Sequence, residues 1–419
     1  MPCGDCLRNF CIIRAMVTAK IHDTISSLKS TFPTGSTVVV GLSGGVDSAV
    51  TAWILKKAGF EVSAVFLKCY PNTPGCRSEE DLKDAIKVAS QLEIPLTTMD
   101  FIEEYRQQVL NEFYAEYAAG RTPNPDIWCN SRIKFGSFFN KVMKESGADY
   151  FATGHYLRKT NKQISKRANK QNNQTTEIQN TKFKIQDSNA PHKSLLLRGV
   201  DEGKDQSYFL YRIPQYALDK SIFPLGGLLK KEVRALASEL DLPVSDKRDS
   251  TGICFVGQVD LKEFLKEEIK PQEGNIVTRG GEVIGMHRGV WYYTYGQRRG
   301  FETSVNEPVY VIGKDLEKNE LIVGAYEETF VHDFEVDDLF WRVEVEQSAV
   351  SSQQSEIECL VRIRNLGELV PAEVSIKQVN NEQRAIAKVT TKEKIQAPAP
   401  GQSAVFYKDD VVLGGGVIK

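Results

Sequence analysis

Short apolar runs alternate with amphipathic stretches between residues 36 and 156. Val38, Val39 and Val40 form the centre of a β-branched run, and stretches with helical periodicity follow it and the later runs. Consecutive parallel strands need a crossover between them, so this alternation predicts β-α-β units and a parallel sheet covered on both faces. We expect strands at 36–43, 61–68, 95–101 and 149–156, and helices at 46–57, 79–92, 103–119 and 132–145.

A polar stretch at residues 157–194 interrupts this pattern. It is rich in Lys, Asn, Gln and Thr and poor in large apolar residues, so it cannot bury enough surface to offset the entropy of ordering. We predict an expanded surface loop, with contact between its basic side chains and RNA as the alternative. A short strand is expected at 195–197, followed by mainly helical structure at 206–242.

Beyond Glu268 the pattern changes to short alternating strands separated by Gly, Asn and Asp turns. A second β segment runs from Phe334 to Lys419, so two small barrels or sandwiches appended to an α/β domain are the simplest arrangement. Strands are expected at 275–278, 282–286, 290–294, 310–315 and 320–323. The predicted parts are an extension at 1–32, an α/β domain at 33–262 with an insertion at about 158–194, a central β domain at 263–332 and a C-terminal β domain at 333–419.

The length of 419 residues agrees with two to three domains, since a domain averages about 150 residues. The formal net charge is −2, so the chain has no overall basic field, and any nucleic acid must be bound by local basic patches. No apolar run approaches the ~18 residues of a membrane-spanning helix, which argues against a membrane-spanning protein.

The eight cysteines are too sparse and too irregularly spaced for a disulfide-stapled secreted protein, so we expect a reducing compartment. Cys3, Cys6 and Cys11 lack a second Cys or His pair at zinc spacing, which favours an unstructured N-terminal extension over a metal site. The basic residues of the first 20 positions form only a weak presequence pattern. A cytoplasmic location is therefore predicted, with a mitochondrial location as the alternative.

A glycine-rich turn joins the first expected strand to the first expected helix. Its glycines let backbone N–H groups approach an oxyanion, and the helix N-terminus adds partial positive charge, so the turn is a predicted phosphate site. It lacks the spacing and the lysine of a Walker loop. The pattern S-G-G-x-D-S resembles instead the pyrophosphatase loop (PP-loop) of the ATP-pyrophosphatase superfamily, whose members split ATP into AMP and pyrophosphate. The residues are Gly41, Leu42, Ser43, Gly44, Gly45, Val46, Asp47 and Ser48.

Two cysteines lie in loops that suit a nucleophile. Cys129 follows two prolines and Asp126, and Asn130 is the candidate cap of the next helix, whose N-terminus favours a thiolate. Cys254 lies in a glycine-containing loop after a basic stretch, where positive charge also favours the thiolate. A buried, inert thiol is the alternative for a single cysteine. Two such thiols together with an ATP-cleaving loop indicate sulfur transfer, in which ATP activates a carbonyl oxygen and a persulfide replaces it.

Further motifs identify a family. In order they are T-P-N-P-D-x-x-C-N, I-K-F, A-T-G-H-Y, K-D-Q-S-Y-F-L, F-P-L-G, G-I-C-F, Y-T-x-G-Q-R-x-G and P-G-Q-S-A-V-F-Y. Together with the PP-loop they resemble the tRNA-specific 2-thiouridylase family over roughly residues 36–419. The resemblance implies a Rossmann-like PP-loop domain with a parallel sheet, a small central β domain and a C-terminal β-barrel.

The implied reaction is ATP-dependent sulfur transfer to C2 of the wobble uridine of tRNA, through an adenylated intermediate and a cysteine persulfide. By the resemblance, the PP-loop binds the phosphates of ATP, and Leu67 and Gly154 line the adenosine site. Leu67 stands where the family usually has Met. A Mg²⁺ ion bridging the phosphates is implied, with Asp47 as a possible contact.

The resemblance makes Asp126 the acid/base, Cys129 the nucleophile and Cys254 the persulfide carrier, with a Cys129–Cys254 disulfide as one outcome after sulfur has left. The family often has Tyr at the position of Asn365. Contacts to the base or to tRNA are implied for Asn124, Pro125, Asp126, His155, Lys204, Asp205, Gln206, Arg364, Asn365 and Gln402.

The implied partners are the anticodon stem-loop of tRNA and a sulfur-donor protein, either a cysteine desulfurase or a sulfur-relay carrier. Two other functions stay open at this point. One is a PP-loop ligase or amidotransferase acting on a small metabolite, which would not need Cys129 and Cys254. The other is a non-catalytic module that binds tRNA or a sulfur carrier and retains affinity for ATP. Release of AMP and pyrophosphate on addition of unmodified tRNA distinguishes the three.

Overall fold

A computed structural model of the chain describes residues 19–70, 78–160, 183–184, 194–249, 260–345, 356–378 and 385–419. The described residues form two units. The first contains 19–105, 129–160 and 194–249, and the second contains 106–128, 183–184 and the described residues from 260 onward. Residues 106–128 therefore group with the β-rich part of the chain. Within the described ranges, no helix has the length and apolar character to cross a membrane.

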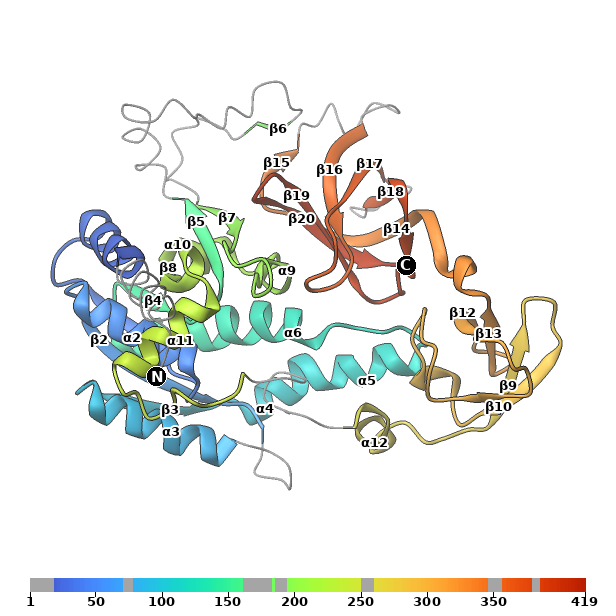
Figure 1. Ribbon diagram of the computed structural model, residues 1–419, viewed down its shortest axis with the longest axis horizontal. Coiled ribbons are helices and arrows are strands. Elements are labelled where there is room, and N and C mark those ends of the chain that lie inside the picture. The colour runs from blue at the N-terminus through green and yellow to red at the C-terminus, as the bar shows by residue number, and fades with distance from the viewer. Residues whose placement is uncertain are drawn as a thin grey trace, which may run out of the picture. The chain divides into compact units, whose positions relative to one another are not determined.

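The first unit is built on a parallel sheet, as predicted (Figure 1). Its strands are β1 (Thr37–Gly41), β2 (Glu61–Lys68), β3 (Leu96–Asp100), β4 (Tyr150–Ala152) and β8 (Ser221–Ile222), in the order β3-β2-β1-β4-β8. The chain winds outward to β2 and β3 on one side of β1, and β4 and β8 lie on the other side. The carboxyl ends of β1 and β4 thus form a topological switch point, where ligands bind in open α/β sheets.

Helices cover the sheet because its side chains alternate between two apolar faces. Val38 and Val40 share a buried cluster with apolar residues of α2 (Val46–Lys57), α3 (Ser78–Gln91) and α11 (Lys230–Glu239). The ring of Phe151 faces the opposite way and contacts Phe138 and Phe139 of α7 (Phe138–Ser146). A helix at residues 19–31 adds Ile21 and Leu28 to the first cluster, although the sequence pattern places these residues in an extension.

The fourth strand of the sheet is shorter than predicted. It ends at Ala152, and residues 157–160 form β5 (Leu157–Thr160), which pairs antiparallel with β7 (Leu195–Arg198). Leu157 and Leu196 are fully buried, so the first residues of the predicted polar loop are held by apolar packing. The rest of that loop lies outside the described residues, apart from the two-residue strand β6 (Phe183–Lys184), which pairs with β15 (Glu344–Val345). The mainly helical stretch contains α9 (Ser207–Leu210), α10 (Gln215–Lys220) and the 3₁₀ turn η3 (Pro224–Gly227).

Two predicted helices have different bounds. The first is divided into α4 (Ile102–Tyr105), the π-helical η1 (Arg106–Leu110) and α5 (Asn111–Ala118). The second begins seven residues earlier than expected, with α6 (Pro125–Trp128), and continues as η2 (Cys129–Ser137). Proline suits the first helical position because its missing N–H has no intrahelical partner there. Asn124 Oδ1 accepts the Asp126 N–H at 3.2 Å, so Asn124 caps this helix and the predicted capping role of Asn130 is wrong.

The second unit contains a small central β domain. After α12 (Leu261–Lys266) come β9 (Gly274–Thr278), β10 (Val283–His287), β11 (Glu302–Thr303), β12 (Tyr310–Asp315) and β13 (Glu320–Gly324). Their order is β11-β10-β9-β13-β12, with β9 and β13 parallel and the other pairs antiparallel. The predicted strand at 290–294 is wrong: Val290–Tyr292 is a 3₁₀ turn, η4, in which Tyr292 N–H bonds back to the Gly289 carbonyl.

The C-terminal part is a closed antiparallel barrel, preceded by the 3₁₀ turn η5 (Tyr326–Thr329). Its strands are β14 (Phe330–Trp341), β16 (Glu356–Arg362), β17 (Val370–Gln378), β18 (Ala385–Gln396), β19 (Ser403–Lys408) and β20 (Val411–Ile418). They follow the order β14-β18-β17-β16-β19-β20, and β20 pairs with β14 to close the barrel. At the closure a Cβ on Gly414 would lie 2.3 Å from the Phe340 carbonyl oxygen, which explains glycine there. The predicted barrel is confirmed.

Candidate functional site

The PP-loop lies at the switch point of the parallel sheet. It leaves β1 at Gly41 and enters α2 at Val46. The turn is closed by Ser48, whose hydroxyl accepts the Ser43 N–H at 3.1 Å and donates to the Gly45 carbonyl at 3.1 Å. The N-cap residue of α2 is Gly45, and among the described residues no side-chain hydrogen bond caps this helix start. The first N–H groups of this helix are therefore available to an anion, and the helix dipole favours negative charge there.

The glycines of this region meet two different requirements. Gly44 has φ +71°, and a Cβ there would lie 2.1 Å from the Asp81 carbonyl oxygen. At Gly154, beyond the end of β4, a Cβ would lie 2.8 Å from the backbone carbon of Asp47. Gly44 and Gly154 are thus needed for packing. Among the described residues, only the Ser43 hydroxyl lies within 4 Å of the Cβ position of Gly45, at 3.4 Å, so this part of the chain leaves room for a ligand at Gly45.

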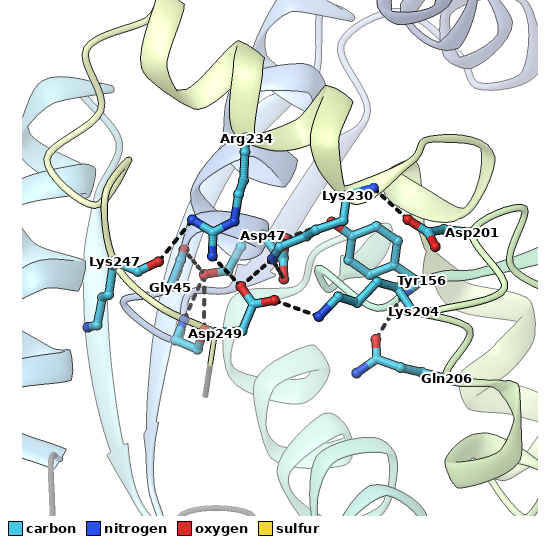
Figure 2. A network of polar contacts seen from close by, with 12 residues as sticks. Gly45, Asp47, Tyr156, Asp201, Lys204, Gln206, Lys230, Arg234, Lys247 and Asp249 are labelled. Carbon is cyan, nitrogen blue, oxygen red and sulfur yellow. Dashed lines mark hydrogen bonds and ion pairs between the residues drawn. The ribbon is translucent and has the colours of Figure 1, made fainter. Parts of the chain in front are cut away.

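Asp47, in the first turn of α2, is held in an ion pair (Figure 2). Lys230 Nζ donates to Oδ1 at 2.7 Å and to Oδ2 at 2.8 Å, and the Tyr156 hydroxyl donates to Oδ1 at 2.8 Å. Burial and the nearby Asp47 charge raise the pKa of Tyr156, so this hydroxyl stays protonated. The Asp47 carboxylate therefore has a fixed orientation at the start of the helix.

Asp249, the last described residue of the range 194–249, belongs to the same network. It lies 2.8 Å from Lys230 Nζ, 2.7 Å from Lys204 Nζ and 2.5 Å from Arg234 Nη2. Burial disfavours its charge, but the hydrogen bonds from Lys204 and Lys230 are together stronger and hold the pKa of Asp249 well below its usual value. Figure 2 shows these side chains converging from α11 and the segments around 204 and 249.

Lys247 anchors the PP-loop from the same segment. Its Nζ donates to the Gly44 carbonyl at 2.9 Å and to Asp81 and Asp84 of α3, each at 2.7 Å. Although burial opposes the Asp84 charge, the hydrogen bond from Lys247 lowers the pKa of this carboxyl. Lys247 and Asp249 thus fix the end of the described range that stops at residue 249, and Cys254 lies outside the described residues.

Sequence analysis did not assign Lys230, Arg234, Lys247 or Asp249 to the site. A partial signal was present, because Lys230 and Arg234 are spaced i, i+4 and so share one face of α11. The carboxylates they meet lie outside α11, with Asp249 15 residues after Arg234 and Asp47 183 residues before Lys230, and no periodicity indicates that pairing.

The described residues do not by themselves form a magnesium site. Both carboxylate oxygens of Asp47 accept hydrogen bonds from Lys230. In the described part of the chain there is also no group of three or more His, Cys, Asp and Glu side chains arranged to hold a metal ion.

Several residues implied as tRNA contacts are turned inward. The Asp205 side chain is fully buried and accepts hydrogen bonds from Gly199 N–H and from the Ser207 N–H and hydroxyl, at 3.0 to 3.1 Å. Gln206 Oε1 accepts the Tyr156 N–H at 2.9 Å. Lys204 is partly exposed but pairs with Asp249. These contacts fix the turn at residues 204–206. Of these three residues, Lys204 is the one whose charge is accessible.

His155 is half-buried beside the sheet end. Its Nδ1 lies 2.8 Å from the Thr153 hydroxyl, and its ring centroid is 5.8 Å from that of Phe135. Burial lowers the pKa of His155 well below its usual value, and the positive charge of Lys134 lowers it further. The ring is therefore neutral at pH 7. Leu67, near the carboxyl end of β2, is half-buried.

The predicted base-contacting residues lie in and beside α6. Asn124 and Asp126 are half-buried, Pro125 is buried, and Cys129 begins η2 with no exposed surface. Asp126 and Cys129 are spaced i, i+3 along consecutive helical segments. A one-turn spacing brings side chains toward the same side of a helix.

The barrel residues present a charge at the surface. Arg364 is exposed, and its Nη2 donates to the Gln396 carbonyl at 2.6 Å. Asn365 is half-buried. Gln402 is half-buried, and its backbone is fixed by Ala399 and Ile418.

Three family models match consecutive parts of the chain. The tRNA methyl transferase HUP domain matches residues 36–258, the tRNA methyl transferase PRC-barrel domain 262–325, and the aminomethyltransferase beta-barrel domain 331–418.

Curated relatives cover nearly the whole chain. The tRNA-specific 2-thiouridylase MnmA of Enterococcus faecalis is 40% identical over 391 residues, which are 91% of this chain and 94% of that protein. Those of Psychrobacter cryohalolentis and Shewanella oneidensis are 41% and 40% identical over 92% of this chain, covering 91% and 96% of their own lengths.

Among solved structures, the chain has a TM-score of 0.34 with the U34-tRNA thiolase NcsA from Methanococcus maripaludis, at 19% identity over 60% of this chain and 72% of that chain. NMN synthetase from Francisella tularensis also scores 0.34, at 17% identity over 59% of this chain and 80% of that chain.

Proposed function

The chain belongs to the tRNA-specific 2-thiouridylase family and forms 2-thiouridine in tRNA by sulfur transfer, and from this premise we propose how its residues divide the reaction. The observation that carries the proposal is the start of α2. It has no side-chain cap and follows a glycine turn at the switch point of the sheet. We assign the ATP phosphates to residues 43–48, with Gly45 allowing close approach and Lys230 and Lys247 holding the loop.

In this proposal the substrate is the wobble uridine. Its O2 attacks the α-phosphorus of ATP, pyrophosphate leaves, and O2 becomes part of an adenylate. Asn124, Pro125 and Asp126 meet the base, and Asp126 moves protons. The adenosine is assigned to the region of Leu67 and Gly154. A Mg²⁺ ion that accompanies ATP would offset the negative charge of the phosphates, while Asp47 of the loop is already paired with Lys230.

The sulfur steps use two thiols. A donor protein, a cysteine desulfurase or a sulfur-relay carrier, leaves a persulfide on Cys254. The terminal sulfur adds to C2 and AMP departs with the former O2, which leaves a disulfide between the base and Cys254. The Cys129 thiolate attacks Cys254 Sγ, so a Cys129–Cys254 disulfide forms and 2-thiouridine leaves as the thiolate. A dithiol reductant then restores both thiols. Release of hydrogen sulfide from the persulfide by Cys129, followed by its addition to C2, is the other possible order.

Binding of tRNA is assigned to Lys204 and Arg364, with His155, Asp205, Gln206, Asn365 and Gln402 shaping the surfaces around them. The fully buried carboxylate of Asp205 supports a role in fixing its turn. We place the enzyme in the cytoplasm. A small-metabolite ligase is not favoured, because the relatives that cover over nine-tenths of the chain bear the tRNA-specific 2-thiouridylase name.

The test uses radiolabelled sulfur and mass spectrometry of tRNA nucleosides. Cys254→Ser should fail to accept label from the donor, and Cys129→Ser should accept the label without completing 2-thiouridine. The matched control is Cys359→Ser in the barrel, where burial raises the pKa of the thiol to about 12 and makes it inert. Full thiolation by Cys129→Ser or Cys254→Ser would contradict the assignment.

A further inference from the structure

The loop that carries Asn124 and Asp126 starts from a rigid helix end. Beyond α5, Gly120 has φ +72°, and its N–H bonds to the Tyr117 carbonyl at 2.8 Å. The next N–H, of Arg121, bonds to the Glu116 carbonyl at 2.9 Å. These two bonds and the left-handed glycine form a Schellman motif, which sets the direction in which the chain leaves the helix.

The central β domain contacts this helix end at Gly120. Lys314, on β12, donates from Nζ to the Gly120 carbonyl at 2.7 Å. Burial lowers the pKa of Lys314 to about 8, because the amine lies among groups that exclude water. Beside it, Leu316 covers the α-carbon of Gly120: a Cβ on Gly120 would lie 2.8 Å from Leu316 Cδ2. Moving the Lys314 amine away from the Gly120 carbonyl would leave a desolvated donor without this acceptor, which costs free energy. The hydrogen bond therefore favours one position of Gly120 relative to β12.

Two residues later the loop is held a second time. The Thr122 N–H donates to the Pro400 carbonyl of the barrel domain at 2.7 Å, and the hydroxyls of Thr122 and Thr294 lie 3.2 Å apart. Gly401 approaches so closely that a Cβ there would lie 2.9 Å from the Thr122 nitrogen. Thr122 is buried. Both β domains therefore fix the chain immediately before Asn124.

We propose that Lys314 is a positioning residue for the thiolation reaction, which sets the place of residues 123–126, where the chain enters α6, through its contact with Gly120. The inference rests on the proposed roles of Asn124 and Asp126 at the base. It gives the central β domain a task in catalysis: with the half-buried Lys314 and with Thr294, this domain holds the chain that leads to the proposed base-contacting residues. A shift of about 1 Å in such a loop is enough to lower a rate by one to two orders of magnitude.

The experiment compares Lys314→Met with Lys318→Met in the full-length enzyme. Lys318 lies in the turn that follows β12, with 69% of its side chain exposed and an ion pair to Asp315 at 3.5 Å. Hydrogen–deuterium exchange is measured for peptides covering 121–128 and 41–48. Single-turnover thiolation of tRNA, ATP affinity and thermal unfolding are measured alongside.

We expect Lys314→Met to speed exchange in peptide 121–128 at least about fivefold and to slow single-turnover thiolation about tenfold. Exchange in 41–48 and ATP affinity should stay within about twofold of wild type, and Lys318→Met should match wild type throughout. Leu316→Ala exposes the contact between Lys314 and Gly120 but keeps the amine. It should speed exchange in peptide 121–128 and slow single-turnover thiolation, each by a smaller factor than Lys314→Met.

Unchanged exchange in 121–128 for Lys314→Met would overturn the positioning role. Loss of ATP affinity or of thermal stability in proportion to the loss of thiolation would also overturn it, since that pattern indicates general damage to the fold. The proposed function fails separately. If Asp126→Asn retains full thiolation, Asp126 is not the acid/base, whereas the exchange data still decide whether Lys314 holds the loop.

Discussion

Lys230 donates hydrogen bonds to both carboxylate oxygens of Asp47, although the two residues lie 183 positions apart in the chain. The same ammonium group lies 2.8 Å from Asp249, so it connects the PP-loop to the segment before Cys254. Only 11% of the Lys230 side chain is exposed. Removing one partner from a buried ion pair is costly because it leaves the other charges desolvated and unpaired.

Lys230→Met should therefore lower the free energy of unfolding by about 2 kcal/mol and reduce AMP formation more than tenfold, because Asp47 and Asp249 lose their shared cation. Urea unfolding and an AMP-release assay measure the two effects. Lys231→Met is the matched control, since Lys231 is the exposed neighbour on α11. Equal unfolding free energies and equal AMP release for Lys230→Met and Lys231→Met would show that the ion pair contributes to neither stability nor AMP formation.

Gly44 and Gly45 should respond differently to alanine. Gly44→Ala forces a Cβ against the Asp81 carbonyl at a positive φ, so we expect a fall in melting temperature of several degrees, corresponding to about 1–3 kcal/mol. Gly45→Ala has room in the unliganded protein and should keep the wild-type melting temperature, yet weaken ATP binding at least about tenfold.

Calorimetric unfolding and equilibrium dialysis with ATP test this pair of glycines. Normal ATP affinity in a well-folded Gly45→Ala protein would argue against phosphate binding at the open face of this turn.

His155 should make stability depend on pH. Burial, helped by the charge of Lys134, lowers the pKa of His155, so between pH 6.5 and its folded-state pKa the unfolded chain binds a proton that the folded chain does not. Stability is then fully present above about pH 6.5 and falls as the pH drops, by up to about 1.4 kcal/mol per pH unit from this group.

His155→Gln should lose that dependence, as measured by urea unfolding at several values between pH 7.5 and 5. The control is His22→Gln at an exposed position, which should keep the wild-type slope. A wild-type slope in His155→Gln would disprove the contribution.

Arg364 should contribute to the salt dependence of tRNA binding. It is exposed on the barrel, and a cation that contacts a phosphate displaces about one counterion. Arg364→Ala should reduce the slope of log affinity against log salt by about 1, whereas Arg364→Lys, which keeps the charge, should retain most of the slope. Filter binding between 50 and 200 mM salt measures the slopes. Identical slopes for wild type and Arg364→Ala would exclude a phosphate contact.

The sequence by itself determined the features that depend on neighbouring residues. The valine run before Gly41 and the glycines after it predicted a strand, a turn and a helix, and the structure has β1, the PP-loop and α2 there. The alternation of strands and helices similarly predicted the parallel sheet. The short strands after Glu268 predicted two small β domains, barrels or sandwiches, and the family resemblance implied the C-terminal barrel. Strand periodicity and turn chemistry are local properties, so a single sequence carries them.

Other features depended on competition between local signals. Asn124 and Asn130 are both suitable helix caps by residue type. Proline is favoured at the first helical position, so the helix starts at Pro125 and the residue before it, Asn124, is the cap. Residues 19–31 have no strong pattern, yet Ile21 and Leu28 find a place in the core and form a helix. Tertiary burial overrides weak local preference in such segments.

Only the tertiary structure decided which distant charges meet. Lys230 and Lys247 are ordinary surface residue types in the sequence, and their partners Asp47, Asp81 and Asp84 lie more than 160 positions away. The closure of the barrel by β14 and β20, and the contact of Lys314 with Gly120, are of the same kind. Such pairs form because the tertiary fold brings the two segments together. Their energy depends on burial and distance, which no local periodicity in the sequence records.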